Sequence, residues 1–501
     1  MKSVTMRLLT LLLATVMILP LFAACSDPVD TPEGETTVGE AATEAETKDP
    51  TQAALDELGE IDWGGGEFAV LYNATFKNEV HGENGVVDPE GGSSQVINDA
   101  VYNRNSLFED RCNLKWVTLE KEASAMSSAI QNEASAPTGE FQLIDHRLLE
   151  SASMATSGYL YNLYAMDMDL EGPWWDTGTA EFRLSGGVYF MSGSLNFADD
   201  GVTYVLIFNK DMQKTYQNTV PNPYQTARDG EWTLDYFYDV IQGISNDSNG
   251  DGKMNELDTY GFINTWEYGN TFFIGSDLRY INNTNSDGEI TLFLTDKAQM
   301  EKALNVLELS QAIYHNNNAS FMSPPGQEGL GQTAFKENRG LFYGEVVNHL
   351  TPLTQEMETE FGILPVPKYD KAQQYYRTWT HGSGSTFSVT SAVKDDKKET
   401  VGLMLEAYAI LSHQYLKPAY YDIMLTSRNV HDAESAEMMD LMFSNRIYEM
   451  SFYFNSFGFF DLFKSATNDN SDKFSSQYAS KAKSFERQLK SVLRKLEKNN
   501  K

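Results

Sequence analysis

Residues 247–258 have the residue types and the spacing of a calcium-binding loop. Gly252 stands at the sixth position, where such a loop needs a sharp turn. The expected ligands are Asp247, Asn249, Asp251, Lys253, Asn255 and Asp258. Lys253 would bind through its backbone carbonyl and the others through their side chains. Asp258 replaces the longer glutamate that is usual at the twelfth position, so the pattern predicts weak binding of a structural Ca²⁺. The alternative is a turn without metal, because Asn, Asp and Gly also suit turns.

Signatures of catalysis are missing from the sequence. It contains no HExxH, CxxC or GxSxG motif and no phosphate-binding loop that ends in Gly-Lys-Ser/Thr. Its seven histidines lack metal-ligand spacing. Two carboxylates that hydrolyse a glycosidic bond would be paired only in space, so a glycosidase stays open as an alternative. The main expectation is a protein that binds its ligand without transforming it.

Aromatic residues gather in loops beside carboxylates and amides. Trp174 and Trp175 follow a proline, and Trp266 and Tyr268 follow the calcium-like loop. Trp379 precedes a turn rich in Gly and Ser. Flat rings beside hydrogen-bonding groups are what a sugar needs, because its C–H faces stack on rings while its hydroxyls bind polar atoms. For any single tryptophan, packing in the core is the alternative.

The elements that would position these residues follow a strand–helix alternation. Residues 67–72, 114–119 and 141–145 are predicted strands, and residues 96–111 and 124–133 are predicted helices. This order predicts parallel strands in an α/β unit. Further strands are expected at 188–191, 203–209, 340–343, 361–365 and 385–390, and further helices at 233–244, 297–314, 398–416, 436–443 and 474–497.

Open α/β sheets place their ligands at the carboxyl ends of the strands. The loops at these ends, together with the aromatic positions, therefore supply the candidate ligand-binding residues. They are Tyr72, Asn73, Asp145, Trp174, Trp175, Trp232, Trp266, Tyr268, Glu345 and Trp379. We expect the rings to stack on sugar faces while Asp145 and Glu345 accept hydrogen bonds from hydroxyl groups.

Residues 1–24 have the pattern of a secretory signal peptide. The apolar run at residues 8–19 is too short to span a membrane comfortably. Small residues precede Cys25, as in a bacterial lipobox, although Phe22 stands where leucine is usual. We therefore expect Cys25 to carry a lipid anchor, and an ordinary cleavage site is the alternative. The remaining cysteine, Cys112, then has no partner for a disulfide.

The charge of the chain narrows the range of partners. Residues 25–60 hold eleven acidic residues against one lysine and have almost nothing to bury, which predicts a disordered tether. The whole chain of 501 residues has 38 basic and 71 acidic residues, a formal net charge of −33. Phosphate backbones would repel such a chain, so the composition argues against nucleic acid as a partner.

Several motifs, in their order along the chain, resemble the extracellular solute-binding proteins of family 1. They are PWWD at 173–176, VLIFNK at 205–210, GEWTLD at 230–235, YGF at 260–262, FGILPVPKY at 361–369 and PAYY at 418–421. That family comprises the lipoprotein receptors of carbohydrate ABC importers and is similar in fold to maltose-binding protein. The likeness implies two α/β lobes with an interlobe cleft, joined by a hinge that the chain crosses more than once.

The resemblance also implies a division of the chain. The expected parts are lobe 1 at 61–198 plus 341–412, lobe 2 at 199–340 plus 413–465, and a C-terminal helix at 466–501 packed on the body. Crossings between the lobes are expected near 195–202 and 333–341. The last helix has a basic outer face, so a membrane or partner surface is the alternative to simple packing.

By this likeness the chain is expected to be a lipid-anchored monomer on the outer face of the cell membrane. It would capture a carbohydrate, expected to be an oligosaccharide, and deliver it to the permease subunits of an ABC transporter. Two other classes stay open: a secreted lipoprotein glycosidase, and a sensor or adhesion lipoprotein on the same fold. Within the leading class, a peptide or a polyamine is the alternative ligand.

Overall fold

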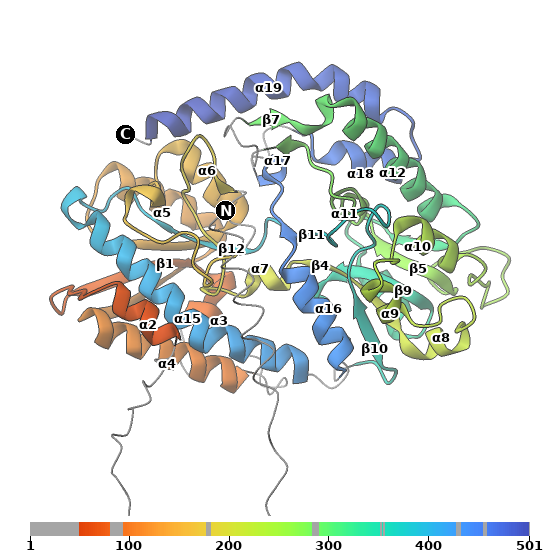
Figure 1. The fold of residues 1–501 in the computed structure, drawn as a ribbon, viewed down its shortest axis with the longest axis horizontal. Helices are drawn as coiled ribbons and strands as arrows, with labels where there is room; N and C mark the ends of the chain where they lie inside the picture. Colours follow the sequence, from red (N-terminus) through yellow and green to blue (C-terminus); the bar gives the residue numbers. More distant parts are fainter. Residues whose placement is uncertain are drawn as a thin grey trace, which may run out of the picture. The chain divides into compact units, whose positions relative to one another are not determined.

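The computed structural model describes residues 50–80, 94–176, 182–282, 290–350, 353, 356–426, 432–453 and 458–499. The predicted signal peptide, Cys25 and most of the predicted tether lie outside these residues. By its contacts, Asp49–Lys501 forms one unit. Two β-sheets with their covering helices organise this unit, and we call them lobe 1 and lobe 2 (Figure 1).

Lobe 1 is built on a four-stranded sheet. Its strands, in spatial order, are β12 (Ser385–Val389), β3 (Leu143–Arg147), β1 (Glu67–Asn73) and β2 (Lys115–Lys121). β1 pairs in parallel with β2 and β3, whereas β12 runs antiparallel to β3. Six of the seven residues of β1 are buried. The predicted alternation of parallel strands and helices is confirmed here, because each local apolar run forms a strand of the sheet.

Helices cover the sheet of lobe 1, and the longest of them comes from late in the chain. They are α2 (Pro50–Glu57), α3 (Lys77–Val80), α4 (Ser94–Cys112), α5 (Ala123–Ser135), α6 (Leu148–Ser157) and α15 (Lys398–Thr426). α15 packs along α4, and α2 packs on α15 with Leu55 buried. The tether predicted to reach residue 60 is therefore wrong at its end, since residues 50–57 are helical. Three short 3-10 turns belong to the same part: η1 (Ala74–Phe76), η2 (Leu163–Ala165) and η6 (Asp395–Lys397).

Lobe 2 is built on a five-stranded sheet of mixed direction. Its strands, in spatial order, are β10 (Phe361–Leu364), β4 (Tyr204–Asn209), β9 (Gly340–Val346), β5 (Tyr260–Thr265) and β8 (Ser320–Ser323). β4 runs antiparallel to both of its neighbours, and β5 runs parallel to β9 and β8. All residues of β4 and β5 are buried, which is typical of a central strand covered on both faces.

Within the described residues, eight helices surround this sheet. They are α8 (Lys210–Thr215), α9 (Pro223–Arg228), α10 (Leu234–Ile241), α11 (Gly269–Gly275), α12 (Lys297–His315), α13 (Gly329–Lys336), α16 (Ala433–Phe443) and α18 (Asp461–Asn468). The Asp296 side chain caps α12 by accepting the backbone N–H groups of Ala298 and Gln299. Smaller elements complete the lobe: β6 (Ile281–Asn282), β7 (Thr291–Leu292), η4 (Phe293–Thr295) and η5 (Val347–His349).

The chain passes between the two sheets more than once. The first passage includes α7 (Ala198–Gly201), inside the range 195–202 expected from the sequence. The return expected near 333–341 is wrong, because β9 and β10 are both strands of the second sheet. β9 pairs with β4 and β5, which are far away in sequence, so no local pattern indicates its lobe. The chain returns to lobe 1 only between β10 and β12.

Two further differences from the expected layout concern lobe 1. The strand predicted at 188–191 is absent, and Met191 makes only a single bridge to Phe387. The switch to lobe 2 predicted at residue 413 is also wrong, since α15 continues to Thr426 and packs Leu416 and Ala419 against α4. Pro418 lies inside α15, and the helix continues through it.

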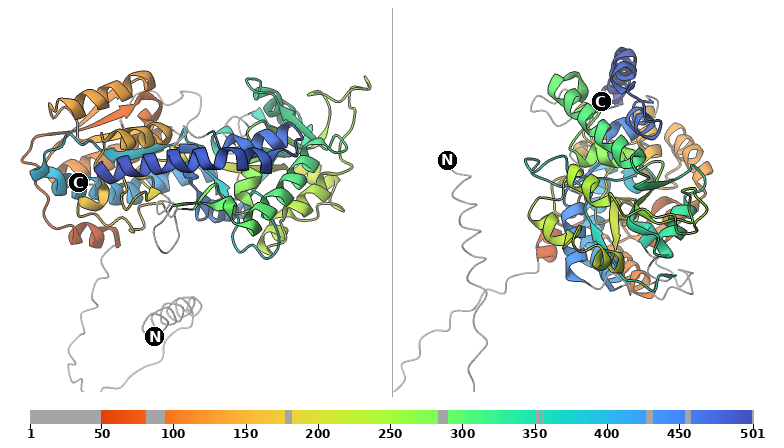
Figure 2. Two further views of the ribbon diagram at one scale, coloured as in Figure 1. Left: turned by 90° about the horizontal axis from the view of Figure 1, so that it is seen from above. Right: turned by 90° about the vertical axis from the view of Figure 1, so that its right-hand side faces the viewer.

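Short pairings and one long helix connect the lobes. β11 (Thr378–Trp379), on the return passage, pairs with β13 (Arg446–Ile447), and α17 (Met450–Tyr453) contacts α6. The last helix, α19 (Phe474–Asn499), contacts α12 and α18 of lobe 2 and α6 of lobe 1 (Figure 2). Within the described residues, no helix has the length and apolar character needed to cross a membrane.

Candidate functional site

Among the predicted ligand residues on the strands of lobe 1, Tyr72 and Asn73 end β1 and Asp145 lies in the middle of β3, and all three are buried. The Tyr72 hydroxyl donates to Glu120 Oε2 at 2.7 Å. The Asn73 side chain accepts the Thr75 backbone N–H at 3.1 Å and lies 3.4 Å from His146 Nδ1. The polar groups of Tyr72 and Asn73 therefore already contact neighbours within the protein.

Asp145 stands apart from these residues because neither of its oxygens accepts a hydrogen bond in the described part of the chain. Its carboxyl is fully buried. Burial, together with the negative charge of Glu79, raises the pKa of Asp145 well above its usual range, although Arg104 acts in the opposite direction. The buried surroundings of Asp145 thus favour its protonated form.

Trp174 and Trp175 lie beside the first passage between the lobes. Residue 175 forms a backbone bridge with Gly193, and the Trp175 indole Nε1 donates to the Asp169 carbonyl at 2.6 Å. Both rings are buried and belong to the main apolar core. Gly193 has a positive φ of 155° and approaches residues 174–176 so closely that a Cβ would collide with their backbone. The two tryptophans act here as packing residues, the alternative left open by the sequence.

Trp232 and Tyr268 lie in the core of lobe 2. The Trp232 ring contacts Phe237 and Phe342, and its Nε1 donates to the Pro365 carbonyl at 2.9 Å. The Tyr268 hydroxyl donates to the Val205 carbonyl at 3.1 Å. Both side chains are fully buried, so they support the sheet and present no ring to solvent in this structure.

Trp266, in contrast, is partly exposed just beyond the carboxyl end of β5. Its Nε1 donates to Glu328 Oε1 at 3.1 Å, and Lys464 Nζ lies 4.1 Å from the ring centroid. A cation over the face of an indole is attracted by its quadrupole and helps to hold the ring. Trp266 is therefore a fixed aromatic surface at the strand end where a ligand is expected.

Glu345 and Trp379 are buried near the same edge of lobe 2. Glu345 accepts the Tyr343 hydroxyl at 2.9 Å and lies 3.3 Å from His349 Nδ1. The hydrogen bond to Glu345 raises the pKa of His349. The Trp379 ring stacks on Tyr204 with centroids 4.8 Å apart and an angle of 10° between the planes.

Three partly exposed side chains lie against this buried stack, and we call the whole group the Glu267 cluster: Tyr204, Glu267, Trp379, His381 and Phe452. Glu267 Oε2 lies 3.4 Å from the Tyr204 hydroxyl and 3.9 Å from His381 Nε2. The Phe452 ring centroid lies 5.1 Å from those of both Trp379 and His381. The side chains of Glu267 and His381 are 30% and 25% exposed, so both reach the surface.

Burial and charge set the protonation states in the Glu267 cluster. Burial raises the pKa of Glu267, while nearby Lys464 lowers it. Burial, helped by Lys464, lowers the pKa of His381 to about 4. The imidazole is therefore neutral in ordinary solution and can both donate and accept a hydrogen bond. A neutral imidazole, a carboxyl group and aromatic rings together match the hydroxyls and C–H faces of a sugar.

The Glu267 cluster combines residues of lobe 2 with residues of the segments that connect the two lobes. Tyr204 begins β4, Glu267 follows β5, and His381 lies on the passage that leads from β11 to β12. On that passage the Gly382 carbonyl accepts the backbone N–H of Leu149 in lobe 1 at 3.2 Å. The sequence pointed to Trp379 and, through Trp266, to the loop of Glu267. It gave no signal for Tyr204 or Phe452, since their neighbours in the cluster are distant in sequence.

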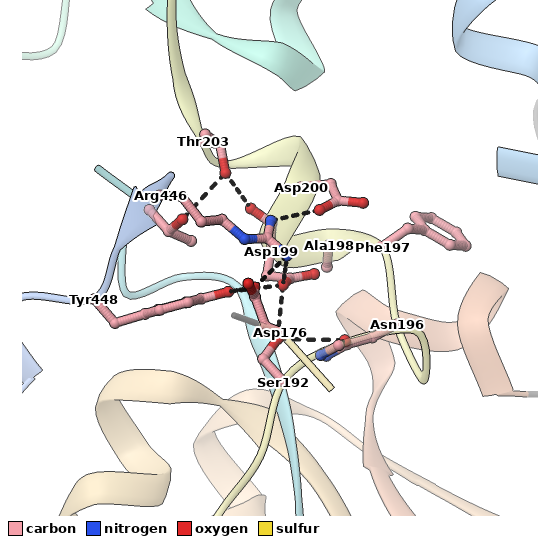
Figure 3. A network of polar contacts seen from close by, with 12 residues as sticks. Asp176, Ser192, Asn196, Phe197, Ala198, Asp199, Asp200, Thr203, Arg446 and Tyr448 are labelled. Atoms are coloured by element: carbon pink, nitrogen blue, oxygen red, sulfur yellow. Dashed lines mark hydrogen bonds and ion pairs between the residues drawn. The ribbon is translucent and has the colours of Figure 1, made fainter. Parts of the chain in front are cut away.

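A buried ionic network fixes the passages beside this cluster (Figure 3). Arg446, in β13, forms ion pairs with Asp176, Asp199 and Asp200. The Tyr448 hydroxyl donates to Asp176 at 2.5 Å and to Asp199 at 2.9 Å. Burial opposes the charge on Asp176, but Arg446, Tyr448 and Lys417 together outweigh this effect and lower the pKa of that carboxyl.

The calcium-like loop is organised by its own hydrogen bonds. Asp247 accepts the backbone N–H groups of Gly250 and Gly252, both at 2.8 Å. The buried Asp258 accepts those of Ser248 at 2.9 Å and Asn255 at 2.8 Å, one on each oxygen. Within the described ranges, no group of three or more His, Cys, Asp or Glu side chains is arranged to hold a metal ion. Calcium binding therefore stays a prediction.

The two sheets and the passages between them define a fold like that of the periplasmic binding proteins. Solved structures with the same fold are similar to this chain. A cyclo/maltodextrin-binding protein complexed with maltotetraose is similar with a TM-score of 0.52 and 12% identity, over 86% of this chain and 96% of that one. UspC of M. tuberculosis is similar with a TM-score of 0.51 and 13% identity, over 83% and 98%. The sequence matches no protein-family model and no curated protein.

Proposed function

We propose that this protein is an extracytoplasmic solute-binding protein that captures an oligosaccharide and delivers it to the permease of an ABC importer. The observation that carries this proposal is the fold, shared over 86% of the chain with a cyclo/maltodextrin-binding protein. Proteins of this architecture bind solutes between two lobes and close on them. Binding without chemical change also agrees with the absence of catalytic motifs from the sequence.

The Glu267 cluster and Trp266 support a carbohydrate ligand. Trp266 and Phe452 offer ring faces, and both are partly exposed. Glu267 and the neutral His381 offer hydrogen-bonding atoms beside them. The mixed charge of the edge, with Lys464 next to Trp266, favours a neutral polyhydroxylated ligand over a polyamine. The predicted acceptor Glu345 is already bonded to Tyr343, so Glu267 takes that role in this proposal.

The ligand proposal is tested by thermal unfolding against a panel of compounds. The panel contains linear and cyclic glucose oligosaccharides, other oligosaccharides, short peptides and polyamines. A ligand at a hundredfold excess over its Kd stabilises the folded protein by about 2.7 kcal/mol. We expect at least one oligosaccharide to raise the melting temperature, and we expect the peptides and polyamines to leave it unchanged. A response to peptides or polyamines alone would contradict the carbohydrate assignment.

Two further experiments distinguish a solute-binding protein from a glycosidase and from a sensor or adhesion lipoprotein. Hydrolysis of a chromogenic glycoside by the purified protein would identify a glycosidase, and we expect no turnover. Co-purification with a permease, increased by ligand, would support transport. A protein that binds sugar but never associates with a permease would instead be a sensor or an adhesion lipoprotein.

Membrane attachment through Cys25 is the second part of the proposal, and the residue lies outside the described structure. Small residues and an apolar signal core precede it. The change Cys25→Ser should release the protein into the medium, because no acyl chain can then be attached. Fractionation of cells into membrane and medium after a high-salt wash measures this, because salt removes purely electrostatic membrane contacts. Retention of the variant with the membranes would place the anchor elsewhere.

A further inference from the structure

The outer face of α19 carries a line of five basic residues, which we call the α19 stripe: Lys483, Arg487, Lys490, Arg494 and Lys498. Successive members are separated by four, three, four and four positions, the spacing that returns to one helix face. All five are exposed, whereas Phe485, Leu489 and Leu496 on the opposite face are buried. At 1.5 Å per residue the stripe is about 22 Å long.

Most charges of the stripe are unpaired. Lys490 forms an exposed ion pair with Glu486 at 2.7 Å. Arg487 Nε donates to the Lys483 carbonyl, which leaves its positive charge uncompensated. Lys483, Arg494 and Lys498 form no ion pair with any described residue. The helix has seven basic and two acidic residues in a chain whose formal net charge is −33, so positive charge is concentrated here.

The stripe rests on a fixed support that includes both lobes. Near its start, α19 packs Phe474 on Phe463 and Tyr478 on Phe459, with ring centroids 5.5 and 5.3 Å apart. Near its end, the Leu496 carbonyl accepts the Tyr189 hydroxyl at 2.9 Å. Figure 2 shows the helix running along both lobes.

The composition of this face indicates the chemistry of its partner. Serines such as Ser484 and Ser491 stand between the cations, and the outermost line has no aromatic or aliphatic side chain. Protein interfaces are depleted in lysine and depend on buried aromatic anchors, which this face lacks. A straight row of mobile cations instead suits a partner whose negative charge is spread over a surface.

We propose that the α19 stripe docks the protein onto an anionic lipid surface. A flat bilayer can meet all five cations at once, and each is worth about a fivefold gain in binding. Ionic screening limits the reach of charge to about 8–10 Å, so the acidic side chains on other faces oppose this contact only weakly. Docking would fix which face of the protein meets the membrane. It goes beyond the proposed function and does not depend on carbohydrate binding.

The test uses residues 49–501, which form one unit with their own core and contain no acyl chain. Sedimentation with vesicles compares phosphatidylcholine alone with a mixture containing phosphatidylglycerol. The stripe variant combines Lys483→Gln, Arg494→Gln and Lys498→Gln. The matched control combines Lys214→Gln, Lys371→Gln and Lys394→Gln, which are exposed lysines outside α6, α12 and α18, the helices that contact α19. Both variants change the net charge equally, and melting curves verify that each is folded.

We expect the parent chain and the control to bind the anionic vesicles and not the neutral ones, with loss of binding in high salt. The stripe variant should bind about a hundredfold more weakly, since three charges are removed. Equal binding by the stripe variant and the control would overturn the proposal. So would an absence of preference for anionic vesicles. Binding to soluble polyphosphate but not to vesicles would assign the stripe to a polyanion instead of a membrane.

Discussion

Arg446 shows how much one buried side chain determines at the passages between the lobes. Its guanidinium is buried with the carboxylates of Asp176, Asp199 and Asp200. Desolvation of these charges is costly, and their mutual attraction compensates only while all the partners are present. We expect Arg446→Met to lower the free energy of unfolding by about 3–5 kcal/mol, measured by urea denaturation.

The control for this prediction is an arginine with comparable ion pairs in solvent. Arg228 contacts Glu434 at 2.9 Å and Glu437 at 2.8 Å, and all three side chains are partly exposed. Such surface pairs contribute about 0–1 kcal/mol, so Arg228→Met should change stability by no more than that. Equal losses in the two variants would contradict the role given to the buried network.

Glu79 predicts a dependence of stability on pH. Its carboxyl accepts the Phe197 backbone N–H at 2.9 Å and the Ser385 hydroxyl at 2.9 Å, so it joins α3 to the first passage and to β12. Burial, with a contribution from Asp199, raises its pKa from 4.5 to about 8. Arg104, whose guanidinium donates to the Glu79 carbonyl, and Asp145 also face this group.

Because the folded-state pKa of Glu79 is raised, the folded protein holds this proton more tightly than the unfolded chain. The contribution to stability is fully present below about pH 4.5 and is lost as the pH rises through about 8. We expect Glu79→Gln to reduce this decline in urea unfolding measured across the window. The exposed Glu358→Gln should leave the decline unchanged. An identical pH profile for wild type and Glu79→Gln would refute the prediction.

In the calcium-like loop, the spacing of the residues and their hydrogen bonds point to different roles. The spacing predicts a Ca²⁺ site, yet both oxygens of Asp258 already accept backbone N–H groups. If calcium binds the folded state alone, a chelator should lower the melting temperature by mass action, and Asp251→Ala should abolish this difference. Asp99→Ala, in α4, should keep it. An unchanged melting curve of the wild type with chelator would show that the loop is only a turn.

Local patterns predicted the elements better than their partners. β1, α4, β2 and α5 match the expected ranges closely, because alternating apolar runs and helical spacing depend on near neighbours. The lobe of β9 was predicted wrongly because its pairing with β4 joins residues far apart in sequence. For the same reason the sequence gave no sign that Arg446 meets Asp199, or that Phe452 meets Trp379.

The candidate site was predicted only in part for a related reason. A tryptophan in a loop fits a ligand surface or a core equally well, and only the fold decides between them. It placed Trp232 in the core of lobe 2 and left Trp266 partly exposed at the end of β5. The rule that ligands meet the carboxyl ends of strands led to these loops, but it did not distinguish side chains that face the edge of the sheet from those that face inward.

For the molecule as a whole, the central prediction is that an oligosaccharide binds where the two lobes meet. Calorimetric titration of the best oligosaccharide from the panel into three proteins tests it most directly: wild type, Trp266→Ala and Trp232→Phe. Loss of a stacked ring should weaken binding about tenfold in Trp266→Ala with little change in melting temperature. Trp232→Phe should lower the melting temperature and leave Kd unchanged. Unchanged affinity in Trp266→Ala, or no oligosaccharide binding by the wild type, would contradict the account.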